Sequence, residues 1–414
     1  MGKPTIRFEG YTDDWEQRKL EDIIEKLTGG ASIAPDDYVD AGYRTIPKGA
    51  VNSSGIADMS GCKIVSEDFF KKNISSKTSS GELVTSLRDL VSTAPNMGRI
   101  VRICGDYEDF LMPQGVYSII VKKKISEDFL IAYSNSPEYR KIIMAEKNGS
   151  TQVHIRNGEF LNIDIPLPSY EEQMKIGKQF NYLDHLITLH QRKCEETKKL
   201  KKFMLQKMFP QKGEKVPKIR FDGFTDDWEQ RKLGELAEIV GGGTPSTGMD
   251  SYWDGDIDWY APAEIGEQIY LESSQRKITE EGLNKSSAKI LPIGTVLFTS
   301  RAGIGKTAIL LKEGCTNQGF QSIVPNKEKL DSYFIFTRSE ELKEYGEKVG
   351  AGSTFVEVSG KQMANMDLMM PKTMSEQQQI GEYFQTIDHL ITLHQRKCEE
   401  LQNIKKFMLQ NMFV

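Results

Sequence analysis

The stretch DHLITLHQRKCEE decides the fold of this chain, because it occurs at Asp184–Glu196 and again, letter for letter, at Asp388–Glu400. Around each copy, residues suited to a helix seam recur in a 4-3-4-3 rhythm. A 3.5-residue period kept over several heptads is typical of a coiled coil, so we predict two long helices that pair with each other. The predicted seam contains Ile176, Phe180, Leu183, Ile187, Ile380, Phe384, Ile387 and Ile391.

The rest of the chain repeats as well. The leader Ile6–Leu20 returns at Ile219–Leu233, so the two leaders lie slightly further apart along the chain than the two helix blocks do. Each half therefore consists of a leader, a variable body and a long helix, and the first body is the longer one. Near-identical ends predict one surface presented to identical partners, and divergent bodies predict that each half reads something different. Duplication followed by free drift of the loops would explain the divergent bodies but not the matching ends.

The fold class is predicted to be α+β, because the bodies mix short strands with helices. The chain order predicts a first domain at 1–165, a central helix at 166–210, a linker at 211–218, a second domain at 219–370 and a C-terminal helix at 371–414. Within the bodies we predict strands at 291–300, 308–311 and 322–324, and helices at 127–146 and 330–346. A helix of about 40 residues would be roughly 60 Å long, which suits a spacer.

The composition indicates a cytoplasmic protein. No apolar run approaches the roughly 20 residues that span a bilayer, and the N-terminus lacks the apolar stretch of a signal peptide. The five cysteines form no CxxC pair, which is typical of reduced thiols. The net charge of -5 argues weakly against nucleic acid, although a basic groove can lie on an acidic chain.

Two motifs suggest other chemistry. The turn Ser300–Thr307 resembles a phosphate-binding P-loop but lacks the first glycine of that pattern. His190, Cys194, His394 and Cys398 could bind zinc if they met at one level of a helix pair, but a role in fixing the seam register is favoured. Motifs of hydrolases and methyltransferases are missing from the sequence, so we expect no catalytic residue and no metal in this chain.

The bodies carry residue types that read DNA, placed on glycine-rich turns at matching landmarks of the two halves. Gly98-Arg99 matches Gly305-Lys306, and Gln114-Gly115 matches Gln318-Gly319. Arg and Lys pair with guanine, Gln and Asn pair with adenine, and hydroxyl groups bind phosphates. The candidate DNA-binding residues are Arg88, Asn96, Arg99, Arg102, Gln114, Thr244, Ser246, Arg301, Lys306, Asn317 and Gln318.

Several of these motifs together resemble a known family. They are the leader Asp226–Ser246, the turn Thr299–Ile309, the segment Asn317–Phe320 and the EQxxIxxxFxxxDxLITLHQRK helices. Over essentially the whole chain, they resemble the specificity subunit of type I restriction–modification systems. The resemblance implies that each body is a target-recognition domain for one half of a bipartite, asymmetric site on double-stranded DNA. It also implies that the two helices form an antiparallel coiled coil that sets the spacing between the half-sites.

The resemblance further implies the partners. Two methyltransferase subunits would dock on the repeated surfaces, and two restriction subunits, which act as motor and nuclease, would join them. S-adenosylmethionine, ATP and magnesium would belong to those partners, leaving this chain without a cofactor and without a membrane partner. Two other hypotheses stand beside this one: a P-loop-like nucleotide-binding protein, and a coiled-coil adaptor with no DNA role.

Overall fold

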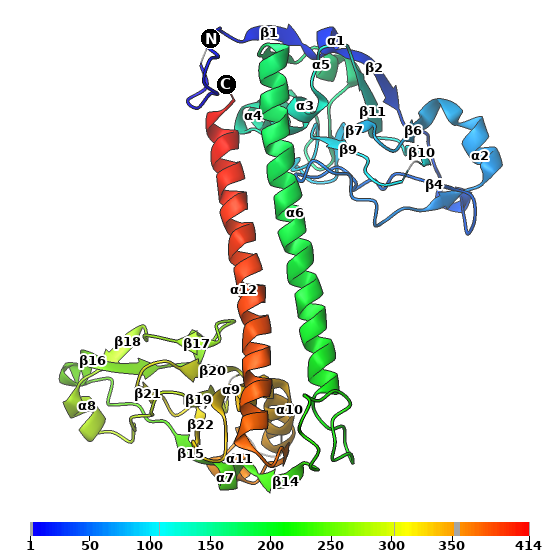
Figure 1. Cartoon of the computed structure of the whole chain (residues 1–414). Coiled ribbons are helices and arrows are strands. Elements are labelled where there is room, and N and C mark those ends of the chain that lie inside the picture. The colour runs from blue at the N-terminus through cyan, green and yellow to red at the C-terminus, as the bar shows by residue number, and fades with distance from the viewer. Residues whose placement is uncertain (1–2, 107, 302, 352–356, 414) are drawn as a thin grey trace. The chain divides into compact units, whose positions relative to one another are not determined.

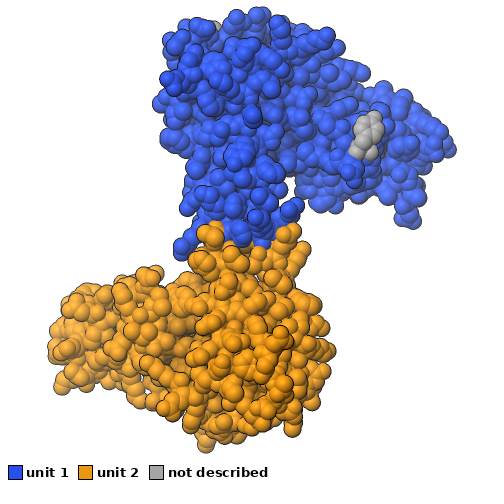
Figure 2. All heavy atoms as spheres, viewed as in Figure 1, with its two compact units in different colours: residues 1–193, 394–414 blue, residues 194–393 orange. Residues whose placement is uncertain are grey.

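The computed structural model describes residues 3–106, 108–301, 303–351 and 357–413. The chain forms two compact units (Figure 2): unit 1 contains residues 1–193 and 394–414, and unit 2 contains residues 194–393. Each unit combines one body with part of each long helix, α6 (Tyr170–Lys207) and α12 (Met374–Asn411), which Figure 1 shows in green and red. The segments predicted from the sequence follow the order of the chain, whereas each compact unit combines parts of several of these segments.

The two long helices pair antiparallel. In unit 1, Asp184 of α6 forms an ion pair with Lys405 of α12, and further along the pair, His190 lies against His394 with 3.0 Å between their Nδ1 atoms. The residue number rises on one helix as it falls on the other, which fixes the direction of pairing. In unit 2 the repeat-equivalent ion pair joins Lys201 and Asp388 at 2.7 Å.

The predicted seam residues are all buried except Ile391, which is half-buried. Their packing partners divide them into two groups. Leu183 and Ile187 pack against Leu401 of the opposite helix. The earlier residues Ile176 and Phe180 pack into the body of unit 1, and Ile380, Phe384 and Ile387 pack into the body of unit 2. The heptad pattern thus reflects two different contacts, first with the body and then with the partner helix.

The body of unit 1 is built on a four-stranded antiparallel sheet in the order β2-β11-β7-β9. Its strands are β2 (Ile24–Gly29), β11 (Val116–Val121), β7 (Leu83–Ser86) and β9 (Ile100–Arg102). Smaller sheets are formed by β3 (Tyr38–Val39), β4 (Tyr43–Arg44) and β5 (Ile64–Val65), by β6 (Lys77–Ser79) and β10 (Asp109–Leu111), and by β8 (Arg88–Asp89) and β12 (Val153–His154).

The body of unit 2 has a larger sheet in the order β15-β22-β19-β20-β17. Its strands are β15 (Ala237–Gly241), β22 (Gln321–Pro325), β19 (Val296–Phe298), β20 (Thr307–Leu310) and β17 (Tyr270–Leu271). A second sheet contains β18 (Arg276–Ile278), β16 (Trp253–Tyr260) and β21 (Cys315–Thr316). The observed strands overlap the three predicted ones, but β19 is much shorter than 291–300 because a turn at Gly294, with φ +86°, precedes it.

Each leader is fixed to its unit in the same way. The strand β1 (Glu16–Lys19) pairs with β13 (Asp164–Leu167), and β14 (Glu229–Lys232) pairs with β23 (Asp367–Met370), just before each long helix begins. After each long helix a phenylalanine closes an aromatic cluster. Phe413 lies 6.3 Å from Trp15 between ring centroids, and Phe209 lies 5.9 Å from Trp228.

Both predicted body helices are broken into two. The first consists of α3 (Glu127–Tyr133) and α4 (Pro137–Glu146), and Ser136 caps α4 by accepting the backbone N–H of Tyr139 at 3.2 Å. The second consists of α9 (Ser332–Thr337) and α10 (Ser339–Gly350). Proline at the first position of α4 fixes a new helix start there, which explains the first break.

Candidate nucleic-acid interface

In unit 2, two glycine-rich turns touch each other at one edge of the body. The backbone N–H of Gly243 donates to the carbonyl of Thr316 at 2.8 Å. A Cβ on Gly242 would lie 1.9 Å from the carbonyl oxygen of Asn317, so no larger residue fits this approach. The Thr244 hydroxyl in turn donates to the side chain of Gln318. The close packing of the turns brings two of the predicted polar residues into contact.

Arg301 joins the same edge. Its Nε lies 3.5 Å from the position that a Cβ on Gly319 would occupy, and Ser300 donates its backbone N–H to the Gly319 carbonyl at 2.8 Å. The side-chain oxygen of Asn317 accepts the Gly319 N–H at 2.7 Å, which holds this turn in shape. An arginine, an amide and a hydroxyl therefore stand together, as base and phosphate contacts require.

The turn that carries Lys306 is organised around Thr299. The Thr299 hydroxyl accepts the backbone N–H of Lys306 at 2.9 Å and donates to the carbonyl of Gly303 at 2.7 Å. Lys306 itself is exposed, as is Ser246. Ala302, at the centre of this turn, lies outside the described residues. The turn joins the antiparallel strands β19 and β20, whereas a P-loop leads from a strand into a helix, so the geometry argues against the P-loop hypothesis.

Unit 1 repeats this edge with different residues. Gly30 lies so close to Pro113 that a Cβ would come within 2.1 Å of the Pro113 carbonyl oxygen, and Gln114 donates its N–H to the Ala31 carbonyl at 2.7 Å. The side chain of Arg88 lies along Gly115, with its Cδ 3.2 Å from the position of a Cβ there. Arg88 and Gln114 are both exposed.

Arg88 and Arg301 are therefore equivalent. Each lies against the glycine of a Gln-Gly turn, and each forms a β-bridge to a segment that follows the body helices, Arg88 to His154 and Arg301 to Glu357. The two arginines are separated along the chain by the same interval as the two leaders. When the glycine-rich turns are aligned by sequence, Arg99 aligns with Lys306, and the equivalence of Arg88 and Arg301 is missed. An alignment by the interval between the two leaders places Arg88 on Arg301.

Two of the other candidates in unit 1, Arg99 and Arg102, have their guanidinium groups engaged within the unit. Arg99 donates to the Pro95 carbonyl at 2.7 Å and to the side chain of Asn135, and burial together with the nearby Arg140 lowers its pKa to about 10. Asn96 uses its backbone N–H to bind the Asp89 carboxylate at 3.1 Å and is half-buried.

Arg102 is engaged in the same sense. Its guanidinium forms ion pairs with Glu127 at 3.1 Å and with Asp128 at 2.7 Å. Of the predicted residues in unit 1, the structure thus places Arg88 and Gln114 together at the edge that matches unit 2.

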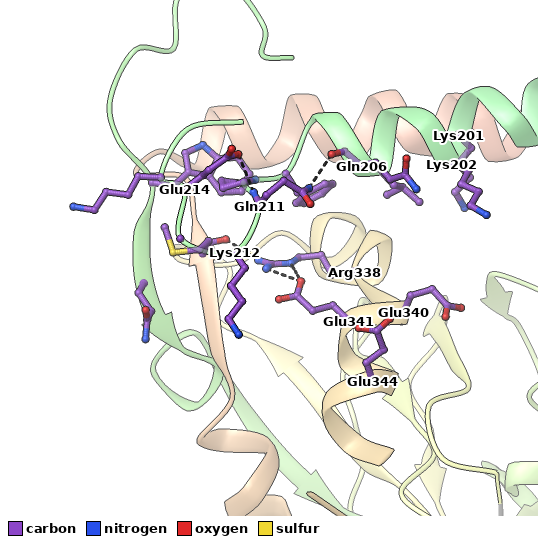
Figure 3. Close-up of a pocket in the computed structure, with 18 of the residues that line it drawn as sticks. Lys201, Lys202, Gln206, Gln211, Lys212, Glu214, Arg338, Glu340, Glu341 and Glu344 are labelled. Atoms are coloured by element: carbon purple, nitrogen blue, oxygen red, sulfur yellow. Dashed lines mark hydrogen bonds and ion pairs between the residues drawn. The ribbon is translucent and has the colours of Figure 1, made fainter. Parts of the chain in front are cut away.

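A separate pocket in unit 2 has walls of opposite charge (Figure 3). Its volume is about 1590 Å³, and it lies between the end of α6, the linker after Phe209 and the start of α10. Lys201 and Lys202 line one part of it, while Glu340, Glu341 and Glu344 line another. None of the residues that line the pocket belongs to the turns that form the edge of unit 2, so this pocket is not part of the candidate nucleic-acid interface.

The described residues contain no group of three or more His, Cys, Asp or Glu side chains placed to hold a metal ion, so the zinc hypothesis finds no support in them. Over the same part of the chain, no helix combines the length and the apolar character needed to cross a membrane.

Comparison with known proteins identifies the family. The family model of the type I restriction modification DNA specificity domain matches residues 12–199 and, a second time, residues 225–403. The chain belongs to this family. The starts of the two matches are separated by the same interval as the repeated leaders, and their ends by the same interval as the repeated helix blocks.

Individual relatives of this specificity family agree. Over 191 residues the chain is 35% identical to the type I restriction enzyme MjaIX specificity subunit of Methanocaldococcus jannaschii, covering 45% of this chain and 44% of that relative, which is less than half its length. It is 26% identical over 403 residues to the putative MjaX specificity subunit of the same organism, covering 95% and 91%. The type I S subunit from M. genitalium has the same fold, with a TM-score of 0.67 at 14% identity over 100% of this chain and 99% of that one.

The predicted family and fold class are thereby confirmed. The chain is a type I restriction–modification specificity subunit with two copies of the specificity domain in a mixed α+β fold. Subunits of this kind are non-catalytic, and the catalytic activities of type I systems lie in partner subunits, as expected from the sequence.

Proposed function

We propose that each unit reads one half of a bipartite, asymmetric site on double-stranded DNA. The supporting observation is the repeated edge, at which Arg88 with Gln114 and Arg301 with Gln318 occupy equivalent places. Equivalent arginines give both units a contact suited to guanine, while the unlike residues around them allow the two half-sites to differ. Unit 2 alone adds further hydroxyl, amide and cationic groups to its edge, from Thr244, Asn317, Ser246 and Lys306.

This proposal is tested by methylation-sensitive long-read sequencing of DNA from cells with and without the gene for this chain. We expect a methylated motif of two unlike halves, separated by a fixed unread gap, which disappears when the gene is deleted. An unchanged methylation pattern in cells that express the chain with its neighbouring genes would contradict the proposal.

We further propose that two methyltransferase subunits dock on the long helices, one on each unit. The support is an exposed apolar pair that recurs at repeat-equivalent positions, Leu200 with Phe203 in unit 2 and Ile404 with Phe407 in unit 1. Phe203 is 48% exposed and Phe407 is 55% exposed, and residues three apart share one face of a helix. Exposed apolar patches mark protein contacts. Restriction subunits would join this assembly, and S-adenosylmethionine, ATP and magnesium would be bound by the partners.

Stoichiometry tests this docking directly. Phe203→Ala and Phe407→Ala should each lose one methyltransferase subunit in native mass spectrometry, and the double variant should lose both. The exposed Ile74 lies outside the long helices, so Ile74→Ala is a matched control that should keep two. If neither phenylalanine variant changed the stoichiometry, these apolar pairs would not be the docking surface.

The paired helices are proposed to set the gap between half-sites. Each has 38 residues, which corresponds to about 57 Å at 1.5 Å per residue. Insertion of one heptad into both helices keeps the seam in phase and should lengthen the unread gap in the methylated motif. A gap of unchanged length in such a variant would contradict a ruler.

A further inference from the structure

The loop that follows Arg88 in unit 1 has an apolar tip. Leu90 is 76% exposed and Val91 is 49% exposed, and both come directly after β8. A single exposed leucine is common on protein surfaces and indicates nothing by itself. What distinguishes this loop is how firmly it is held and which residues stand beside it.

Hydrogen bonds with Asp89 and with Arg140 hold the backbone of this loop in place. The Asp89 carboxylate accepts the backbone N–H of Val91 at 3.3 Å. The guanidinium of Arg140, on α4, donates to the carbonyls of Ala94 at 2.6 Å and Met97 at 2.5 Å, and both of those residues are fully buried. The tip is thus presented on a fixed base, and little conformational entropy remains to be lost when it meets a surface.

The neighbours of the tip belong to the candidate nucleic-acid interface. Leu90 follows Arg88 by two residues. The side chain of Arg88 lies along Gly115, which follows the exposed Gln114. After the equivalent Arg301, unit 2 presents an exposed glycine and the exposed Lys306, with no apolar residue at the surface of the described part of that turn. By the interval that carries Arg88 onto Arg301, the position of Leu90 matches Gly303, so unit 1 has an exposed leucine where unit 2 has no side chain.

We infer that Leu90 contacts the 5-methyl group of a thymine in the half-site of unit 1, next to the base that Arg88 reads. This inference rests on the proposed DNA-reading function. Thymine is the one base that displays a methyl group in the major groove, and apolar side chains recognise it there. A buried contact with that methyl group excludes water from both surfaces, whereas Gly303, at the matching position of unit 2, has no side chain with which to make this contact. Leu90 is therefore a specificity-determining residue of unit 1 alone.

The test uses the full-length chain, purified with the subunits that accompany it, and the site found by methylation sequencing. In a series of duplexes, each thymine of the half-site is replaced in turn by deoxyuridine, which pairs identically but lacks the methyl group. We expect one replacement to weaken wild-type binding roughly fourfold, the effect of about 0.8 kcal/mol for one buried methyl-sized group. Leu90→Ala should bind the unmodified duplex at least that much more weakly and should no longer distinguish that deoxyuridine. Ile74→Ala, which changes an exposed apolar residue of the same unit, should behave as wild type.

The outcomes separate this inference from the function beneath it. If the wild type binds its site specifically but ignores every deoxyuridine, or if Leu90→Ala keeps both its affinity and its deoxyuridine response, Leu90 does not read thymine and the DNA-reading function stands. The same holds if Leu90→Ala loses a partner subunit while its DNA reading is intact, since the tip would then be a protein contact. If the wild type binds all duplexes alike, including scrambled ones, the DNA-reading function itself is wrong.

Discussion

The two leaders are fastened to the long helices by the same buried ion pair, which makes the two units a natural comparison. Arg7 binds Glu172 through two hydrogen bonds of 2.7 and 2.8 Å, and Arg220 binds Glu376 through two of 2.7 and 2.9 Å. The carboxylates are 1% and 2% exposed. In each unit the hydrogen bond to the carboxylate raises the pKa of the arginine, so neither pair is lost near neutral pH.

The structure predicts that loss of the arginine destabilises the two units by different free energies. Removing one partner of a buried ion pair costs about 3–5 kcal/mol, because the other charge stays buried without compensation. In unit 2, Trp228 also donates its indole N–H to Glu376 at 3.1 Å, whereas the indole N–H of Trp15 in unit 1 has no hydrogen-bond partner among the described residues. A hydrogen bond to a charged group contributes about 1.5 kcal/mol or more. We therefore expect Arg7→Ala to lower the free energy of unfolding of unit 1 by about 5 kcal/mol. We expect Arg220→Ala to lower that of unit 2 by about 3 kcal/mol, because Trp228 still binds the carboxylate.

Native-state hydrogen exchange followed by mass spectrometry measures both units in one experiment. Peptides from β11 report on unit 1 and peptides from β22 report on unit 2, and their sequences differ, so the repeat causes no ambiguity. A second change, Glu376→Gln in the Arg220→Ala background, removes the unpaired charge and should recover part of the loss. Arg18→Ala breaks an exposed ion pair with Glu16 and, as the control, should cost less than about 1 kcal/mol.

An Arg220→Ala cost equal to or greater than that of Arg7→Ala would refute this reasoning, because the indole hydrogen bond would then compensate nothing. Costs below about 1 kcal/mol in both units, the range of exposed pairs, would show that the carboxylates are hydrated once the arginines are gone.

Four further predictions concern other parts of the chain. Phe413→Ala should cost about 3–5 kcal/mol in unit 1, measured by the same exchange experiment, because it opens a cavity in the aromatic cluster; a loss below about 1 kcal/mol would contradict that packing. Burial, followed by the charges of His394, Lys193 and Lys397, lowers the pKa of His190 from 6.5. As the pH falls below about 6.5, the unfolded chain therefore binds a proton at His190 more readily than the folded chain does, and the folded state loses stability. Urea midpoints should decline between about pH 7 and 5, and they should decline less in His190→Leu. Gly242→Ala should abolish reading of one half-site in a binding assay while unit 1 exchanges as in wild type, since its Cβ has no room. Arg301→Ala should weaken binding by about 1–3 kcal/mol and relax specificity in one half-site only; equal relaxation in both would contradict independent readers.

The long helices could be predicted from the sequence to within a few residues, because a heptad pattern is a local signal that tertiary contacts reinforce. The start of α4 is also encoded locally, in Ser136 followed by proline, yet the helical pattern from 127 to 146 conceals it. The partners of the seam are not encoded locally. Phe180 and Leu183 are successive steps of the same rhythm, but the first packs on the body and the second packs on the other helix.

The candidate site was predictable only as a set of residue types. Arg88, Arg99 and Arg102 look alike in the sequence, and nothing near them tells which one is engaged by its own domain. The groups that engage Arg102 come from α3, more than twenty residues later, and are brought there only by folding. The interval of the repeat is the one signal that singles out Arg88, and it is a property of the whole chain, not of the loop.

The hydrogen bond between His190 and His394 has a consequence for a protein built from two copies of one sequence. The two rings are repeat equivalents, and each offers the same atom, Nδ1, to the other. Two identical groups cannot share such a bond while remaining identical, because one must carry the proton and the other must offer the lone pair. One ring therefore carries a proton at Nδ1 and the other does not, which breaks the symmetry that the duplicated sequence preserves. Where the two copies of the repeated helix meet, two residues at equivalent places of the same sequence therefore differ in their protonation at Nδ1.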